Sequence, residues 1–137
     1  MSGMSNFVED GLRTLIFRTG AGLTKPTNLF VALHTADPTD AGTGTEVSGG
    51  SYARVQRNPL DANWTAASAT DGITTNAADI TFPAPTANWG VVTHVAVWDA
   101  STGGNLIGHV ALTTPKTVNN GDAAPKFLAG SLSITFA

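Results

Sequence analysis

Short apolar segments that alternate with period two, separated by turn residues, constrain the fold of this chain more than any other feature. In residues 128–136, Leu132, Ile134 and Phe136 alternate with serine and threonine, as in a strand with one buried and one wet face. Residues 29–34 also have the composition of a strand, but apolar side chains fall on both of its faces. These patterns predict an all-β fold, either a β-sandwich or a jelly roll.

Further segments support the same fold class. The clearest hairpin joins residues 91–98 to residues 106–112 through DASTGGN, whose glycines can take positive φ. Additional short strands are expected at residues 51–57 and within residues 73–82. The sequence therefore predicts six to eight strands and no internal repeat.

One helical stripe precedes the strands and consists of four apolar residues: Val8, Leu12, Leu15 and Ile16. Ser5 stands where a helix cap is expected, and two glycines follow the stripe. We expect one short helix within residues 5–18. It would belong to an N-terminal arm, residues 1–26, attached to a β-sandwich of residues 27–137 in a single domain.

The composition excludes several classes of function. Charged residues make up 12% of the 137 residues and the net charge is −3, with no cluster of lysine and arginine to neutralise phosphates. We therefore expect no direct binding of nucleic acid. The absence of a long apolar segment argues against a membrane span, and the absence of cysteine excludes disulfides and thiolate metal sites. A neutral, threonine-rich surface favours a protein packed against neighbours, although a neutral secreted β-domain would have the same composition.

Three histidines are the first candidates for chemistry. His34, His94 and His109 all lie on predicted strands beside apolar residues. They could converge on a metal ion, but their spacing matches no ligand motif. We interpret them as structural residues that are partly buried and hydrogen-bonded within the sheet.

An acidic, glycine-rich loop lies between two of the predicted strands. Asp37, Asp40 and Glu46 are its charged residues and could ligate Ca²⁺, yet their spacing does not match a calcium-loop motif. No nucleophile elbow is present, and a catalytic triad chosen from the available residues would be arbitrary. We expect no catalytic residues, no metal, no cofactor and no enzymatic activity.

Two tryptophans lie in predicted polar loops. Trp64 and Trp89 could anchor an interface or close one end of the β-domain, and the sequence favours neither interpretation. A glycan-binding platform is a weaker alternative. Trp98 lies on the predicted hairpin and is expected in the core.

Several short segments of the sequence are similar to those of a known family. The segments VALHTADPTDAG, EVSGG and YARV are followed by VTHVAVWDA, TGGNLIGH and ITF. Together they are similar to small virion proteins of tailed bacteriophages, which are labelled head decoration (cement) proteins or tail-fibre proteins. The resemblance spans roughly Leu15 to Phe136 and includes no catalytic signature.

This resemblance implies a structural virion protein. Our first hypothesis is a decoration protein that binds the major capsid protein on the capsid exterior and stabilises the shell, after assembly in the host cytoplasm. The alternative is a tail or tail-fibre module that connects tail parts or contacts a host receptor. In either setting we expect a homo-oligomer, a dimer or a trimer.

The same reasoning predicts where contacts lie. We expect most intermolecular contacts from the N-terminal segment, residues 2–17, because an isolated helix this short is marginal in water. We expect the others from the loop of residues 37–50, which is too long and glycine-rich to be ordered economically in a monomer. The candidate interaction residues are the helical stripe, the three loop carboxylates and the two loop tryptophans: Val8, Leu12, Leu15, Ile16, Asp37, Asp40, Glu46, Trp64 and Trp89.

Overall fold

A computed structural model describes residues 3–66 and 72–136, so the outermost residues of the predicted arm and sandwich, 1–2 and 137, lie outside the described residues. The elements in chain order are β1 (Gly3–Met4), α1 (Asn6–Phe17), β2 (Phe30–His34), β3 (Val55–Gln56), β4 (Ile73–Thr75), β5 (Ile80–Thr81), β6 (Gly90–Trp98), β7 (Leu106–Val118), β8 (Lys126–Phe127) and β9 (Ser133–Thr135). The predicted all-β class with one short N-terminal helix is confirmed.

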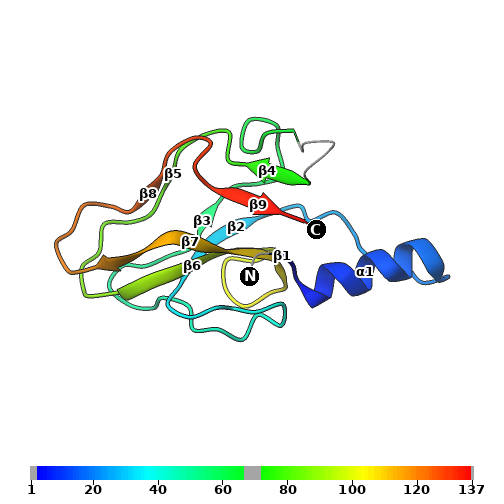
Figure 1. The fold of residues 1–137 in the computed structure, drawn as a ribbon, viewed down its shortest axis with the longest axis horizontal. Helices are drawn as coiled ribbons and strands as arrows, with labels where there is room; N and C mark the ends of the chain where they lie inside the picture. Colours follow the sequence, from blue (N-terminus) through cyan, green and yellow to red (C-terminus); the bar gives the residue numbers. More distant parts are fainter. Residues whose placement is uncertain (1–2, 67–71, 137) are drawn as a thin grey trace.

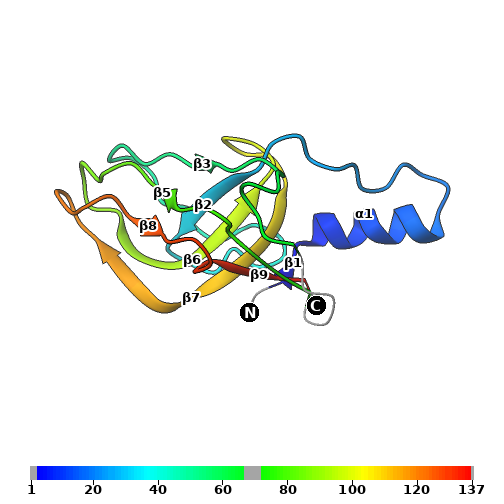
Figure 2. The same cartoon turned by 90° about the horizontal axis from the view of Figure 1, so that it is seen from above.

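Five strands form one antiparallel sheet in the order β1-β7-β6-β2-β3. The long hairpin β6–β7 and the five-residue pairing of β2 with β6 make up most of this sheet. Two separate two-stranded ribbons, β4–β9 and β5–β8, lie over one of its faces (Figures 1 and 2). The result is a two-layered sandwich whose second layer is divided into two ribbons.

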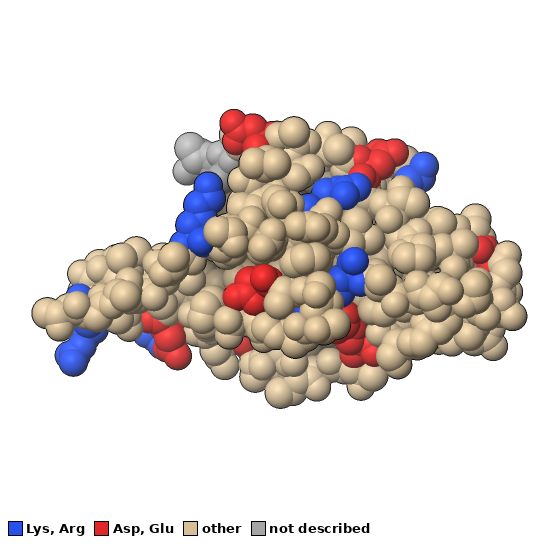
Figure 3. Space-filling view, turned by 180° about the vertical axis from the view of Figure 1, so that it is seen from behind, with Lys and Arg blue, Asp and Glu red and all other residues tan. Residues whose placement is uncertain are grey.

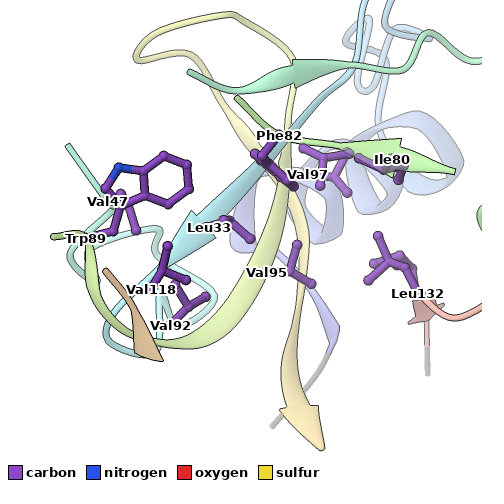
Figure 4. Close-up of a cluster of buried hydrophobic side chains, with 12 residues drawn as sticks. Leu33, Val47, Ile80, Phe82, Trp89, Val92, Val95, Val97, Val118 and Leu132 are labelled. Atoms are coloured by element: carbon purple, nitrogen blue, oxygen red, sulfur yellow. The ribbon is translucent and has the colours of Figure 1, made fainter. Parts of the chain in front are cut away.

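The main core lies between these two layers. Val31 and Leu33 of β2 and Val95 of β6 point into it from the large sheet, because alternate residues of a strand share one face. Phe82 and Leu132 close it from the ribbon side, as the close-up shows (Figure 4). All five side chains are buried, so this cluster is the hydrophobic centre of the domain.

The opposite face of the large sheet is also covered, but by a loop. Ala32, Ala96 and Trp98 are buried there. The loop of residues 35–50 runs along this side, below the sheet in the view of Figure 1. Its carbonyls and amides bond to strand residues, as in Val47 N–H donating to Leu33 O over 3.0 Å. This is why both faces of β2 are apolar in the sequence.

The helix begins where the sequence predicts and its first turn is capped. The Ser5 hydroxyl oxygen accepts a hydrogen bond from Val8 N–H, and Ser5 itself is fully buried. The helix is preceded by β1, which pairs with β7. The first described residues therefore belong to the large sheet, and the arm is an excursion between β1 and β2 rather than all of residues 1–26.

The last strand is shorter than its alternation suggests. Gly130 has a φ of +81°, which ends the alternation before Leu132 and leaves Leu128 exposed. Buried Asn76 holds this turn, because its side chain donates to Leu128 O and accepts from Leu132 N–H, both over 2.9 Å.

Within the described residues, no helix has the length and apolar character needed to cross a bilayer.

Candidate interaction surfaces

The loop of residues 37–50 is anchored by a partly buried ion pair. Glu46 Oε1 lies 2.7 Å from an Arg54 guanidinium nitrogen, and its Oε2 accepts from Arg54 Nε over 2.9 Å. The Tyr52 hydroxyl donates to the same Oε2 over 2.8 Å. Burial alone would raise the pKa of Glu46, but the hydrogen bonds from Arg54 and Tyr52 outweigh it, so the pKa lies below its ordinary value.

The same arginine joins this loop to the β6–β7 hairpin. Its guanidinium donates to Ala100 O and Gly103 O, over 2.8 and 2.9 Å, and lies 4.5 Å from the centre of the Trp98 ring. The Arg54 side chain is only 6% exposed. Four hydrogen bonds and the face of one aromatic ring therefore compensate the buried charge of Arg54. These contacts fix the loop of residues 37–50 and the turn of the β6–β7 hairpin relative to each other.

Histidines line the sheet beneath the loop. His34 stacks on Trp98 at a ring separation of 6.1 Å, and its Nδ1 lies 3.2 Å from Gly44 O of the loop. Burial lowers the pKa of His34. The neutral ring is thus favoured at this position, in agreement with a structural role.

Two further histidines face the acidic start of the loop. His109 is 2% exposed, and its Nε2 lies 2.9 Å from Asp40 Oδ1. Its Nδ1, which forms no hydrogen bond among the described residues, lies 3.7 Å from Asp37 Oδ1. His94 Nε2 lies 3.8 Å from the same oxygen. A hydrogen bond from Thr39 N–H is the main cause that lowers the pKa of Asp37.

These contacts correct the expectation that the loop needs a partner to be ordered. The loop is held by its own chain, through Glu46 and through the two aspartates that face His94 and His109. Glu46 points toward Arg54, and its side chain is 25% exposed. Asp37 and Asp40 remain 42% and 51% exposed at the side chain. No group of three or more His, Asp or Glu residues in the described part is arranged to hold a metal ion.

The second surface is the arm, formed by α1 and the return segment of residues 18–28. In Figures 1 and 2, α1 extends away from the β-domain, and the return segment runs back beside it. Leu23 N–H donates to Gly11 O over 3.1 Å. A Cβ on Gly11 would lie 2.9 Å from Leu23 Cβ, so the absence of a side chain permits this close approach.

The far end of α1 is apolar on several sides. Leu15, Ile16 and Phe17 are 54%, 66% and 78% exposed, and we call these three residues the arm tip. Val8, at the other end of the helix, is 3% exposed and packs inside the chain, while Leu12 is half-buried. Of the predicted stripe, Leu15 and Ile16 are therefore the residues fully available for contact.

The third surface is an apolar groove of about 920 Å³ at one end of the sandwich. Its lining comes from residues before β2, from the segment after β3, and from β4, β7 and the end of β9: Leu29, Leu60, Trp64, Thr74, Ile107 and Phe136 among others. Leu60 and Phe136 are 59% and 39% exposed. Residues 67–71, between the lining residues Ala66 and Gly72, lie outside the described residues.

The two loop tryptophans have different positions. Trp89 is 5% exposed, and its Nε1 donates to Gly50 O over 3.0 Å, so it belongs to the core and is not an interface anchor. Trp64 is half-buried and donates to Arg57 O over 3.1 Å, with its ring in the groove wall. Because that ring is fixed within its own chain, Trp64 forms part of the groove rather than a projecting platform.

Sequence reasoning missed three important residues. Phe17 is the most exposed large apolar side chain of the described residues, and the consecutive run Leu15–Phe17 was a visible signal, because such runs are rare on surfaces. Leu60 had no sequence signal, since a single leucine in a polar loop is ordinary. Arg54 interrupts an apolar segment, and only the fold shows its acidic partner.

The fold and these surfaces define a β-sandwich protein that presents an apolar arm and groove. The chain matches the family model of the podophage GP4 fiber I protein gp80 over residues 3–135. It therefore belongs to this family and is a structural protein of a phage virion. No curated protein is significantly similar to it.

Proposed function

We propose that this protein is a non-enzymatic module of a phage tail fibre, which acts by holding virion subunits together. The observation that carries the proposal is the family match, which covers nearly the whole chain and describes a fiber protein. Decoration of the capsid, and with it a contact to the major capsid protein, has no specific support from this match. It remains an untested alternative.

The arrangement of the molecule supports a connecting role. Arg54 ties the loop of residues 37–50 to the β6–β7 hairpin by hydrogen bonds, which hold these two segments together at one side of the β-domain. The arm projects from the β-domain with its apolar tip farthest away (Figure 2). An apolar tip on a projecting arm is suited to insertion into a neighbouring subunit, because burial of apolar surface drives association.

The low density of charge is consistent with the same role. Figure 3 shows a large uncharged area over the end of the β-domain opposite the arm, whereas the arm itself carries both basic and acidic groups. Neutral surfaces lose little solvation when they are covered by a neighbour. The uncharged end of the β-domain is therefore suited to contact with a neighbouring subunit.

Copy number and position in the particle test this proposal. Quantitative mass spectrometry of purified virions should find far fewer copies of this chain than of the major capsid protein. Gold-labelled antibody should mark the tail in electron micrographs. Label over the head, with copies comparable in number to the capsid protein, would reject the fibre and support capsid decoration.

A further inference from the structure

Exposed apolar side chains are concentrated on two surfaces of this chain. In its described part, eight large apolar side chains are exposed. Six of them belong to the arm or to the groove: Phe7, Leu15, Ile16, Phe17, Leu60 and Phe136. Such a concentration on a small virion protein marks surfaces that are covered in the assembled state.

We propose that the arm tip of each chain inserts into the groove of a second copy, and that the exchange is reciprocal and gives a two-fold symmetric dimer. The occupant of the groove is the apolar run Leu15–Phe17 of the other chain. This proposal goes beyond the fibre assignment and does not depend on it, because it concerns the isolated protein.

The positions of arm and groove permit reciprocity. The groove is lined by Leu29, at the base of the arm, and by Phe136, just after β9. In Figures 1 and 2 the end of β9 lies at the end of the β-domain from which α1 extends. A two-fold axis beside this end therefore places each arm across the groove of the other copy.

The arm is held away from its own groove. At its base, Ser5 N–H donates to Ile107 O over 3.1 Å and Asn6 N–H donates to Asp40 O over 2.9 Å. These bonds fix the direction of α1, whose 12 residues extend about 18 Å. The tip lies at the distal end of this helix. Filling its own groove would break the contacts that orient the arm.

The size of the contact favours two arms over one. An aromatic side chain covers roughly 150–250 Å² when buried. Three side chains that are half to three-quarters exposed thus offer on the order of 350 Å², and a somewhat smaller groove wall faces them. One insertion would bury on the order of 600 Å², whereas a reciprocal pair buries on the order of 1,200 Å², at the lower end of the range of about 1,200–2,000 Å² for stable interfaces.

Charge at the edges of the two surfaces is complementary. Asp61 is the one charged residue among the described residues that line the groove. Arg18 directly follows the arm tip and is exposed. An inserted tip therefore brings a cation toward the single carboxylate of the groove, which sets the orientation of the arm rather than its affinity.

Light scattering after size-exclusion chromatography gives the first test. The unmodified chain should be a dimer. The double variant Ile16→Asp/Phe17→Asp and the groove variant Leu60→Asp should each raise the dimer dissociation constant by roughly tenfold to a hundredfold, since each removes at least one large buried side chain. Leu128→Asp is the matched control, because Leu128 is 58% exposed but lies outside arm and groove, and it should leave the dimer intact.

Cross-linking identifies the occupant of the groove. The chain has no cysteine, so Phe17→Cys in one preparation and Leu60→Cys in another introduce single thiols. Mixing and oxidising the two should give a disulfide-linked pair, whereas Phe17→Cys mixed with Val91→Cys should not.

A monomeric or trimeric unmodified chain would overturn the proposal. So would an intrachain disulfide in a monomeric chain that carries both Phe17→Cys and Leu60→Cys, or equal disruption of the dimer by Leu128→Asp. Because all these experiments use isolated protein, their failure leaves the fibre assignment untouched.

Discussion

At the scale of single residues, the decisive contact is between Glu46 and Arg54. The two side chains are 25% and 6% exposed, and the guanidinium donates four hydrogen bonds, to both carboxylate oxygens of Glu46 and to two carbonyl oxygens of the β6–β7 hairpin. A buried ion pair adds little net stability compared with an apolar pair, but removal of one partner leaves an uncompensated charge. The role of this pair is therefore to fix the loop in one arrangement.

Glu46→Gln should lower the free energy of unfolding by about 3 kcal/mol, because the buried Arg54 loses its counter-charge while the shape of the side chain is kept. Urea denaturation monitored by tryptophan fluorescence measures the change. Asp10→Asn is the control, since Asp10 and Arg13 are 70% and 65% exposed and such pairs contribute at most about 1 kcal/mol. Equal effects of the two substitutions would show that the Glu46 site is not buried in solution.

At the scale of elements, the arm is a helix stabilised by its own return segment. Gly11 is a poor helix residue in isolation. It is required here because Leu23 approaches the helix backbone at this point, with a hydrogen bond from Leu23 N–H to Gly11 O. Gly22, at a φ of +62°, allows the chain to approach the helix just before this contact.

Gly11→Ala should loosen the arm although alanine favours helix by about 1 kcal/mol. The new Cβ would lie 2.9 Å from Leu23 Cβ and 3.2 Å from Leu23 Cα, so the return segment must move. Hydrogen exchange should show faster exchange of the Leu23 amide. Arg13→Ala, on the exposed side of the same helix, should leave that amide protected. If the Leu23 amide of Gly11→Ala were as well protected as in the unmodified chain, the close contact between Leu23 and Gly11 would not be formed in solution.

At the scale of the whole molecule, two histidines lie between the large sheet and the loop of residues 37–50: His34 is buried and His94 is partly buried. Burial is the main cause that lowers the pKa of both His34 and His94 below the ordinary value of 6.5. A histidine with a lowered pKa binds fewer protons in the folded state than in the unfolded state. Its contribution to stability is therefore complete above pH 6.5 and is lost as the pH falls through the folded pKa.

Acidification from about pH 7 to about pH 5 should lower the free energy of unfolding, measured by urea denaturation at each pH. The lowered pKa values of Glu46 and Asp37 have a separate effect, because their contribution is lost only below their unfolded values of 4.5 and 3.8. The double variant His34→Gln/His94→Gln should show a smaller change across this range. Constant or increasing stability on acidification of the unmodified chain would contradict the burial of these rings.

The sequence by itself determined the elements that depend on local pattern. Ser5 and the apolar stripe specified the helix, and the alternation of residues 29–34 and 91–98 specified β2 and β6, because helix and strand periodicities are readable along the chain. The burial of Trp98 followed from the same pattern. The family resemblance gave the virion assignment, while the choice between capsid and fibre was not readable from pattern.

Tertiary structure alone decided the surfaces. Whether Glu46 points inward depends on Arg54, eight residues away, and on carbonyls of the distant β6–β7 hairpin. The groove joins Leu60 to Phe136, which no local pattern relates. Whether the helical stripe is core or surface depends on the direction in which α1 leaves the sheet, and that direction is set by backbone bonds from Ser5 and Asn6 to distant residues. Non-local contacts of this kind carry no sequence period, so burial and exposure at these sites are properties of the fold.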